Sequence, residues 1–306
     1  MDPRFREDDG FSSVIPALLR HSCAERALDL IGGRNPSPRP MDPRFREDDG
    51  FTSVIPALLR HSCGGRNPSP TISSMNTLHL LSAGAAQALA TGMQARFLQL
   101  HGQALAPTFG AVGVMKDKLL AGAPCDVMIL TDALITQLTS GGHLRAGSAR
   151  PLGMVKTGVA VKSGHTRPAV GTPDQLKAAL LAATGIYTAD PVNSTAGIHF
   201  MKVLKALGLE QAVASTLRPF PNGAAAMKAL AASNEAGLIG CTQNTEILYI
   251  DGVELIADLP KEFELATVYT AAIGTLAQSP EAAAQFIALL AGPEASAQRA
   301  AGGFEV

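Results

Sequence analysis

Four short segments of this chain carry small, hydroxyl or amide residues where an apolar, strand-like run gives way to a helical pattern. They are Leu81–Ala86, Thr108–Val114, Asp190–Gly197 and Gly240–Glu246. A helix N-terminus has free N–H groups and a partial positive charge, so it attracts anions. None of the four segments contains Lys or Arg. If these termini converge, they form an anion site without cations, which favours reversible binding over turnover of the anion.

The candidate ligand contacts are backbone, hydroxyl and amide groups of these segments. Gly84 and Gly113 could equally be turn glycines, and Ser194 and Thr195 could be plain N-caps of the helix that follows. Gln243 ends an apolar strand and needs a hydrogen-bond partner if it is buried. The full set of candidates is Ser82, Gly84, Ala85, Gly113, Val114, Ser194, Thr195, Thr242 and Gln243.

The sequence contains no recognisable catalytic or metal-binding arrangement. It has no GxSxG, HExxH or Walker motif and no carboxylate pair at a useful spacing. Cys125 and Cys241 lack CxxC spacing and are predicted to be small buried residues. His199 is predicted to be a packed or interface residue, and Asp190 to fix a turn with Pro191. We therefore expect no catalytic residue, no metal and no cofactor, in a protein that is not an enzyme.

The first 74 residues differ from the rest of the chain. Residues 1–23 recur at 41–63 with one substitution, and residues 32–38 recur at 64–70. Structural repeats diverge outside their core positions, whereas these copies are nearly identical throughout. We interpret residues 1–74 as a translated upstream repeat element that forms no domain, with the functional chain starting at Met75. A disordered or partly helical extension is the alternative, and in either case the segment lacks the apolar area for a core.

Residues 75–306 have the length of a domain with a sizeable core, and they carry 15 basic and 16 acidic residues. This balance gives no electrostatic basis for binding nucleic acid. No apolar run reaches the length of a membrane span.

The chain has no recognisable secretory signal. The apolar stretch Leu78–Ala90 has no basic residue before it, and Pro16 and Arg20 interrupt the best apolar stretch upstream. As written, the chain is expected to be cytoplasmic.

From Met75 onward, strand and helix patterns alternate with short connections. This order predicts mostly parallel sheets whose ligands bind at the carboxyl ends of strands. Two long strand patterns, Gly153–Val161 and Glu264–Gly274, are natural crossovers between two lobes, 75–155 with 265–306 and 156–264. The other expected strands are Thr77–Ser82, one ending at Phe109, Asp126–Leu130, Gly185–Thr188, Leu217–Pro219, Ala236–Cys241 and Val253–Leu259. The expected helices are Ala85–Leu100, Val114–Ala121, Asp132–Leu138, Pro173–Ala183, Gly197–Leu207, Gly223–Ala232, Pro280–Leu290 and Glu294–Ala301.

These features resemble the type II periplasmic-binding-protein fold and, within it, the molybdate-binding family of ABC-transporter solute receptors. The resemblance covers residues 75–306 and rests on Ala121–Val127, Asp190-Pro191 with Ala196–Ile198, Asn234–Ala236, Leu290–Ala295 and Gly302–Phe304. It implies an α/β fold of two lobes, each a mostly parallel sheet flanked by helices, joined by two crossover strands. It also implies a periplasmic monomer that closes on a hinge around a small anion and serves an ABC transporter permease.

The chain differs from that family where ligand specificity arises. The family has a serine at the first helix start, where this chain has Gly84, and a serine cluster at the second, where it has Ala111, Val112 and Gly113. A tyrosine that is usual near the fourth segment aligns with Gln243. These differences favour a larger oxyanion or an organic carboxylate over molybdate. The alternative function is a cytoplasmic ligand-binding module or enzyme on the same fold, with an organic anion as its ligand.

Deleting residues 1–74 is expected to leave the melting temperature and ligand binding unchanged, because the duplicated segment has no coherent apolar face to pack on the domain. Thermal unfolding of the full chain and of a chain starting at Met75 checks this. A loss of several degrees in the shorter chain would show that the segment packs on the domain.

Overall fold

The strands of this protein form one mixed sheet. The structure is a computed structural model that describes residues 77–305, so the predictions for residues 1–74 lie outside the described residues. Within the described range the strand order is β2-β1-β3-β9-β4-β7-β5-β6, with β8 paired to β4. The strands are β1 (Leu78–Ala83), β2 (Leu105–Gly110), β3 (Val127–Thr131), β4 (Arg150–Lys162), β5 (Gly185–Ala189), β6 (Leu217–Phe220), β7 (Leu238–Gln243), β8 (Val253–Asp258) and β9 (Ala266–Ile273).

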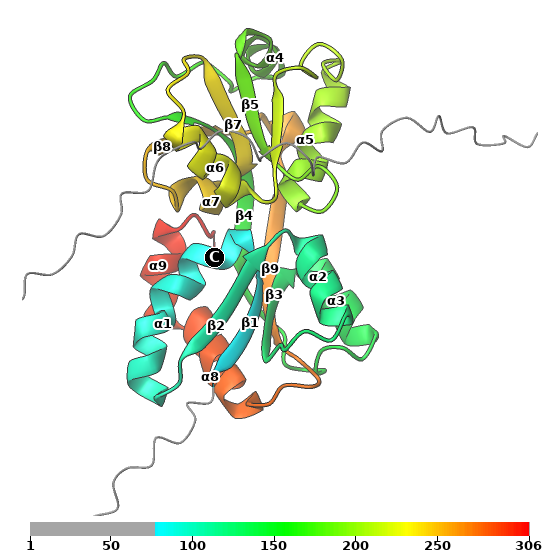
Figure 1. Ribbon diagram of the computed structural model, residues 1–306, viewed down its shortest axis with the longest axis vertical. Helices are drawn as coiled ribbons and strands as arrows, with labels where there is room; N and C mark the ends of the chain where they lie inside the picture. Colours follow the sequence, from blue (N-terminus) through cyan, green and yellow to red (C-terminus); the bar gives the residue numbers. More distant parts are fainter. Residues whose placement is uncertain (1–76, 306) are drawn as a thin grey trace, which may run out of the picture. The chain divides into compact units, whose positions relative to one another are not determined.

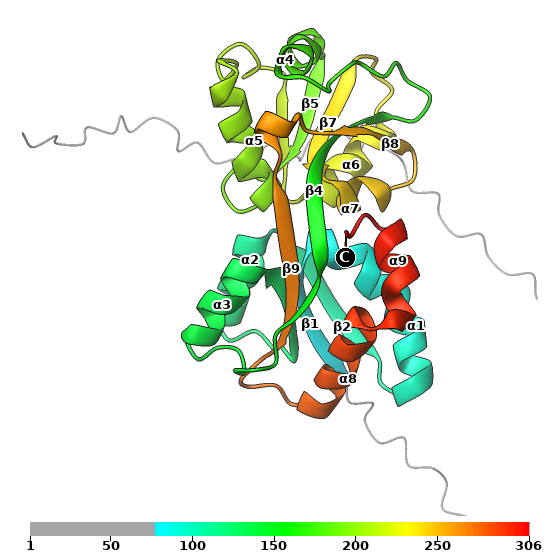
Figure 2. The same ribbon diagram turned by 180° about the vertical axis from the view of Figure 1, so that it is seen from behind.

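Two long antiparallel strands, β4 and β9, join the two halves of this sheet. On one side β2, β1 and β3 run parallel to one another, and on the other side β6, β5 and β7 do the same. Strand β9 pairs with β3 and β4, and β4 continues to β7 and β8. Figures 1 and 2 show β4 and β9 side by side, running from the lower half of the molecule into the upper half. The two-lobed α/β architecture predicted from the sequence is confirmed.

Helices follow most strands and cover the sheet. They are η1 (Gly84–Ala86), α1 (Gln87–His101), α2 (Val112–Leu120), α3 (Asp132–Ser140), α4 (Pro173–Ala182), α5 (Thr195–Ala206), α6 (Gly223–Ala232), α7 (Asn244–Leu248), α8 (Pro280–Ala291) and α9 (Ser296–Ala301), with short turns η2 (Lys261–Phe263) and η3 (Pro293–Ala295). Helix α7 was not predicted from the sequence, because five residues are too few to show helical periodicity. No helix among residues 77–305 is long and apolar enough to cross a membrane.

Each half of the sheet has its own apolar core. The core of the first half draws on residues between Leu78 and Val155 and between Tyr269 and Phe304. Within it, the rings of Phe97 and Phe286 meet edge to face with their centroids 5.0 Å apart. The second half has two clusters, one packed against α4 and α5 and the other against α6, all from residues between 159 and 259. We call these halves lobe 1 and lobe 2 and propose boundaries at 155/156 and 264/265, inside β4 and just before β9.

Helix α5 begins very close to the turn that precedes it. A Cβ added at Gly197 would lie 2.1 Å from the carbonyl oxygen of Asp190 and 2.5 Å from that of Ala189. Only a residue without a Cβ lets the helix approach the backbone at the end of β5 this closely. Gly197 therefore fixes the position of the α5 N-terminus over the carboxyl end of the sheet.

Gly197→Ala is expected to lower the free energy of unfolding by about 1–3 kcal/mol through overpacking, although alanine in a helix is normally favoured over glycine by about 1 kcal/mol. Gly171→Ala is the matched control, because the nearest atom to an added Cβ there lies 3.6 Å away. It should change the stability by less than about 0.5 kcal/mol. Urea unfolding measures both, and a Gly197→Ala protein as stable as the native one would contradict this explanation.

Candidate anion-binding site

The four segments predicted from the sequence lie at the carboxyl ends of β1, β2, β5 and β7. The helices that follow them begin after Ala83, Ala111, Ser194 and Gln243, and no side chain of these N-cap residues bonds the helix. By contrast, Thr172 and Asn222 cap α4 and α6 with their own side chains. The uncapped starts leave backbone N–H groups for other partners.

One of these N–H groups joins the two lobes directly. The backbone N–H of Gly113, in lobe 1, donates to the carbonyl oxygen of Asn193, in lobe 2, over 3.0 Å. Asp190 shapes the turn that presents this carbonyl, since its Oδ1 accepts from the backbone N–H groups of Val192 at 2.7 Å and of Asn193 at 2.8 Å. Burial opposes ionisation of Asp190, but the hydrogen bonds from Asn193 and Val192 outweigh it and lower its pKa. The lobes are therefore in contact at α2.

A second contact between the lobes is made by the buried side chain of Glu246, which the sequence analysis did not select. Its carboxylate accepts from the Thr242 hydroxyl at 2.6 Å and from the backbone N–H of Gly223 at 3.1 Å. A Cβ added at Gly84, in lobe 1, would lie 2.5 Å from the Oε1 atom of Glu246. Burial raises the pKa of Glu246, and these hydrogen bonds counteract the rise only in part. The available signal in the sequence was an acidic residue, Glu246, four positions after Thr242 inside an otherwise neutral segment.

Three polar side chains on one face of lobe 2 are buried without any partner. Neither the amide nitrogen nor the amide oxygen of Gln243 has a hydrogen bond, and the hydroxyls of Thr157 and Thr188 have none. Gln243 stands opposite Thr157 in the β4–β7 ladder, and Cys241, two residues earlier on the same face, stands opposite Thr188 in the β5–β7 ladder. This is the face that α5 covers, because Cys241 belongs to the cluster packed against that helix. Buried polar atoms in native proteins have partners, either in the protein or in ordered water, so these three side chains are candidates for contact with a ligand or a water molecule.

Lobe 1 contributes a tyrosine to the same region. Tyr269 is a fully buried residue of β9, and its phenol is hydrogen-bonded to the side chain of Thr195, at the start of α5. Burial and, to a smaller extent, the nearby charge of Glu246 raise the pKa of Tyr269, so it stays neutral and can donate a hydrogen bond. This role could not be predicted from the sequence, because Tyr269 lies within an ordinary β-branched strand pattern.

The other residues predicted to contact the ligand differ in burial and in hydrogen bonding. The hydroxyls of Ser82 and Thr242 bond to the carbonyl of Ala83 and to Glu246, so both already have partners. Gly84 and Ala85 are buried, and the space beside Gly84 and Gly113 is filled by Glu246 and Asn193 of lobe 2. Val114 is partly exposed, whereas Ser194 is buried beside Thr195.

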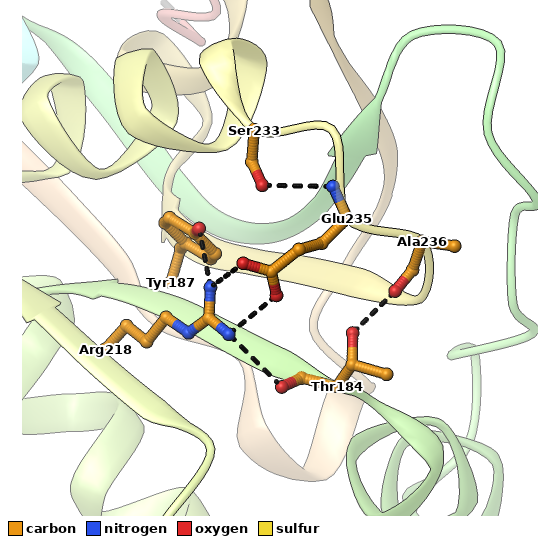
Figure 3. Close-up of polar contacts among 6 residues, drawn as sticks. All are labelled: Thr184, Tyr187, Arg218, Ser233, Glu235 and Ala236. Carbon is orange, nitrogen blue, oxygen red and sulfur yellow. Dashed lines mark hydrogen bonds and ion pairs between the residues drawn. The ribbon is translucent and has the colours of Figure 1, made fainter.

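One cation of lobe 2, Arg218, is engaged away from these segments. The guanidinium of Arg218 binds both carboxylate oxygens of Glu235, at 2.8 and 3.1 Å, together with the Tyr187 hydroxyl and the carbonyl of Thr184 (Figure 3). It also lies over the ring of Tyr187, 5.3 Å from the centroid. Thr184 and Glu235 precede β5 and β7, so this ion pair lies toward the amino ends of these strands, away from the unpartnered groups.

Two free cysteines and a histidine have roles in packing and hydrogen bonding inside the protein. Burial raises the pKa of the half-buried Cys125 to about 12 and also raises that of the buried Cys241. Both thiols are therefore protonated and unreactive at neutral pH. The Nε2 atom of His199 lies 2.8 Å from the carbonyl oxygen of Phe263. Among residues 77–305, no group of three or more His, Cys, Asp or Glu side chains could hold a metal ion.

Comparison with known proteins identifies the family. Residues 78–305 match the bacterial extracellular solute-binding proteins. The chain belongs to this family. A curated relative, aconitate isomerase from a Pseudomonas species, is 26% identical over 195 residues, which is 63% of this chain and 72% of that protein.

Solved structures share the fold of this solute-binding protein at low sequence identity. The periplasmic molybdate-binding protein of Azotobacter vinelandii is 20% identical with a TM-score of 0.62, covering 75% of this chain and 99% of that one. The sulfate-binding protein SubI of Mycobacterium tuberculosis is 14% identical with a TM-score of 0.57, covering 74% and 86%. At these identities the likeness establishes the type II solute-binding fold.

The stability of the protein should depend on pH through Glu246. Its pKa is raised in the folded state above its ordinary value of 4.5, so unfolding releases a proton once the pH exceeds that value. The contribution of this group to stability is therefore present at low pH and is lost as the pH rises through the folded pKa. Urea unfolding of native and Glu246→Gln proteins from pH 4 to 8 should show a steeper decline for the native protein. Glu281→Gln, at an exposed position, should follow the native profile, and parallel profiles for all three would refute the assignment.

Proposed function

We propose that this protein binds a small organic anion between its lobes and delivers it to an ABC transporter permease. The observation that carries the proposal is the set of buried, unpartnered groups of Gln243, Thr157 and Thr188 beneath the uncapped start of α5. Hydroxyls, an amide and helix N–H groups can all donate to an anion. Tyr269 adds a phenol from lobe 1, so a ligand at this position would contact both lobes.

An organic anion fits these groups better than molybdate does. Gly84 and Gly113 bring no hydroxyl, and both face residues of lobe 2. The hydroxyls of Ser82 and Thr242 already have partners inside the protein. The relative named aconitate isomerase acts, by its name, on an organic carboxylate, which supports the same class of ligand here.

The family, described as bacterial extracellular solute-binding proteins, supports a transport role. We propose a periplasmic monomer in which β4 and β9 act as the hinge. The direct bond between Gly113 and Asn193 would then form as the lobes close on the ligand. Reversible binding also agrees with a site that offers neutral donors and no catalytic cation.

An enzymatic role at the same site is the second candidate. The aconitate isomerase relative and the buried side chains of Glu246 and Tyr269 favour it, because carboxylates and phenols can transfer protons. Against it, the Glu246 carboxylate already accepts hydrogen bonds from Thr242 and Gly223. Aconitate incubated with the protein and followed by proton NMR should remain unchanged if the protein only binds its ligand, whereas conversion between isomers would establish the enzyme.

Calorimetry with aconitate, citrate, succinate, sulfate and molybdate tests the proposed binding. We expect a carboxylate to bind and molybdate to bind weakly or not at all. Thr188→Val should weaken carboxylate binding about 10- to 100-fold, since a hydrogen bond to a charged group contributes roughly 1.5–3 kcal/mol. The same change should raise the melting temperature of the ligand-free protein, because it removes a buried hydroxyl that has no partner.

Thr139→Val is the control for this experiment. The Thr139 hydroxyl bonds the carbonyl of Ile135 within α3, at 2.7 Å, and should not affect the ligand. Submicromolar binding of molybdate, with no carboxylate bound, would overturn the proposal of an organic anion. A Thr188→Val protein with unchanged affinity would remove Thr188 from the site.

A further inference from the structure

The amide of Gln243 carries more information about the ligand than the other unpartnered groups do. The side chain is only 2% exposed, and both its nitrogen and its oxygen lack a hydrogen bond. An amide needs an acceptor for its NH₂ group and a donor for its oxygen. Because both ends are unpartnered, this requirement is the same whichever way the amide is oriented.

The neighbouring side chains do not meet this requirement. The hydroxyls of Thr157 and Thr188 make no bond to the amide. The Thr242 hydroxyl lies on the opposite face of β7 from Gln243 and donates to Glu246. Thr195 and Tyr269 are bonded to each other. No described side chain therefore donates to the amide oxygen in this structure, and a bound molecule can supply that donor.

Simple oxyanions cannot supply that donor. Sulfate, molybdate and an ionised carboxylate only accept hydrogen bonds. The hydroxyls of Thr157 and Thr188 can rotate to donate to such an anion, but the oxygen of Gln243 would stay buried without a partner. An unpartnered buried acceptor opposes binding. A ligand that carries a hydroxyl beside its carboxylate satisfies both ends of the amide, because the two ends lie side by side on one planar group.

We infer that the ligand is a 2-hydroxycarboxylate, with its carboxylate accepting from the Gln243 NH₂ group and its hydroxyl donating to the Gln243 oxygen. Gln243 is then the residue that selects hydroxy acids over the corresponding acids without the hydroxyl. This inference rests on the proposed function, since it specifies the ligand of the same site.

Matched pairs of acids test the inference by calorimetry on the full chain. The pairs are L-malate and D-malate against succinate, and citrate against propane-1,2,3-tricarboxylate; within each pair the acids differ by one hydroxyl. We expect the native protein to bind at least one hydroxy acid about tenfold or more tightly than its partner. In Gln243→Leu the preference should fall to about one, with the hydroxy acid losing most of its affinity and the plain acid little.

Gln137→Leu is the matched control, because Gln137 lies on the exposed surface of α3 in lobe 1, and it should keep the native preference. Equal affinities within both pairs in the native protein would overturn the inference and leave the proposed carboxylate site intact. Absence of binding by every acid would overturn the proposed function and the inference with it. Should Gln243→Leu fail to fold, as judged by thermal unfolding, the ratio within the native pairs still decides the question.

Discussion

The antiparallel pairing of β4 with β9 is the constraint on which the rest of this structure depends. It sets Gly153 opposite Tyr269 and Lys156 opposite Ala266, and both strands continue from one apolar core toward the other. Because these strands connect the cores of the two halves, the relative position of the lobes depends on this ladder as well as on the contacts at Gly113 and Glu246. The same strands bring Thr157 and Tyr269 to the region where the lobes meet, so the strands that join the lobes also carry part of the candidate site.

The contacts between the lobes differ in their energetic character. The bond from Gly113 to Asn193 joins two neutral backbone groups and needs little desolvation of charge. Glu246, by contrast, is a buried carboxylate whose ionisation is opposed by its surroundings. Its hydrogen bonds to Thr242 and Gly223 hold α6 and α7 of lobe 2 together, and its oxygen lies against Gly84 of lobe 1. A glycine at position 84 is thus required by the neighbouring carboxylate as much as by any ligand.

Much of the fold could be predicted from local patterns. The apolar run ending at Leu130 and the Thr172-Pro173-Asp174 helix start have the periodicity and capping residues of their elements, and the structure has β3 and α4 there. The alternation of strands and helices gave the two lobes. The candidate residues at the four helix starts remain a prediction, because no bound ligand marks them.

Other parts of the candidate site could not be predicted, for physical reasons. Thr157, Thr188 and Tyr269 lie inside strands, where their polarity resembles ordinary β propensity. Their importance comes from which strands are neighbours in the sheet and which helix covers that face, and a single sequence does not specify either. Glu246 was missed because helix α7 is too short to show periodicity.

The bond between Gly113 and Asn193 uses only main-chain atoms, and the turn that presents the acceptor is held by Asp190. Because this bond involves no side chain of Gly113 or Asn193, substitutions that leave the Asp190 turn intact do not remove it. The main-chain contact between the lobes and the unpartnered side chains of the candidate site thus belong to different residues. Substitutions on the lobe 2 sheet, at positions such as Thr188, could therefore alter the candidate site while this main-chain bond between the lobes stays the same.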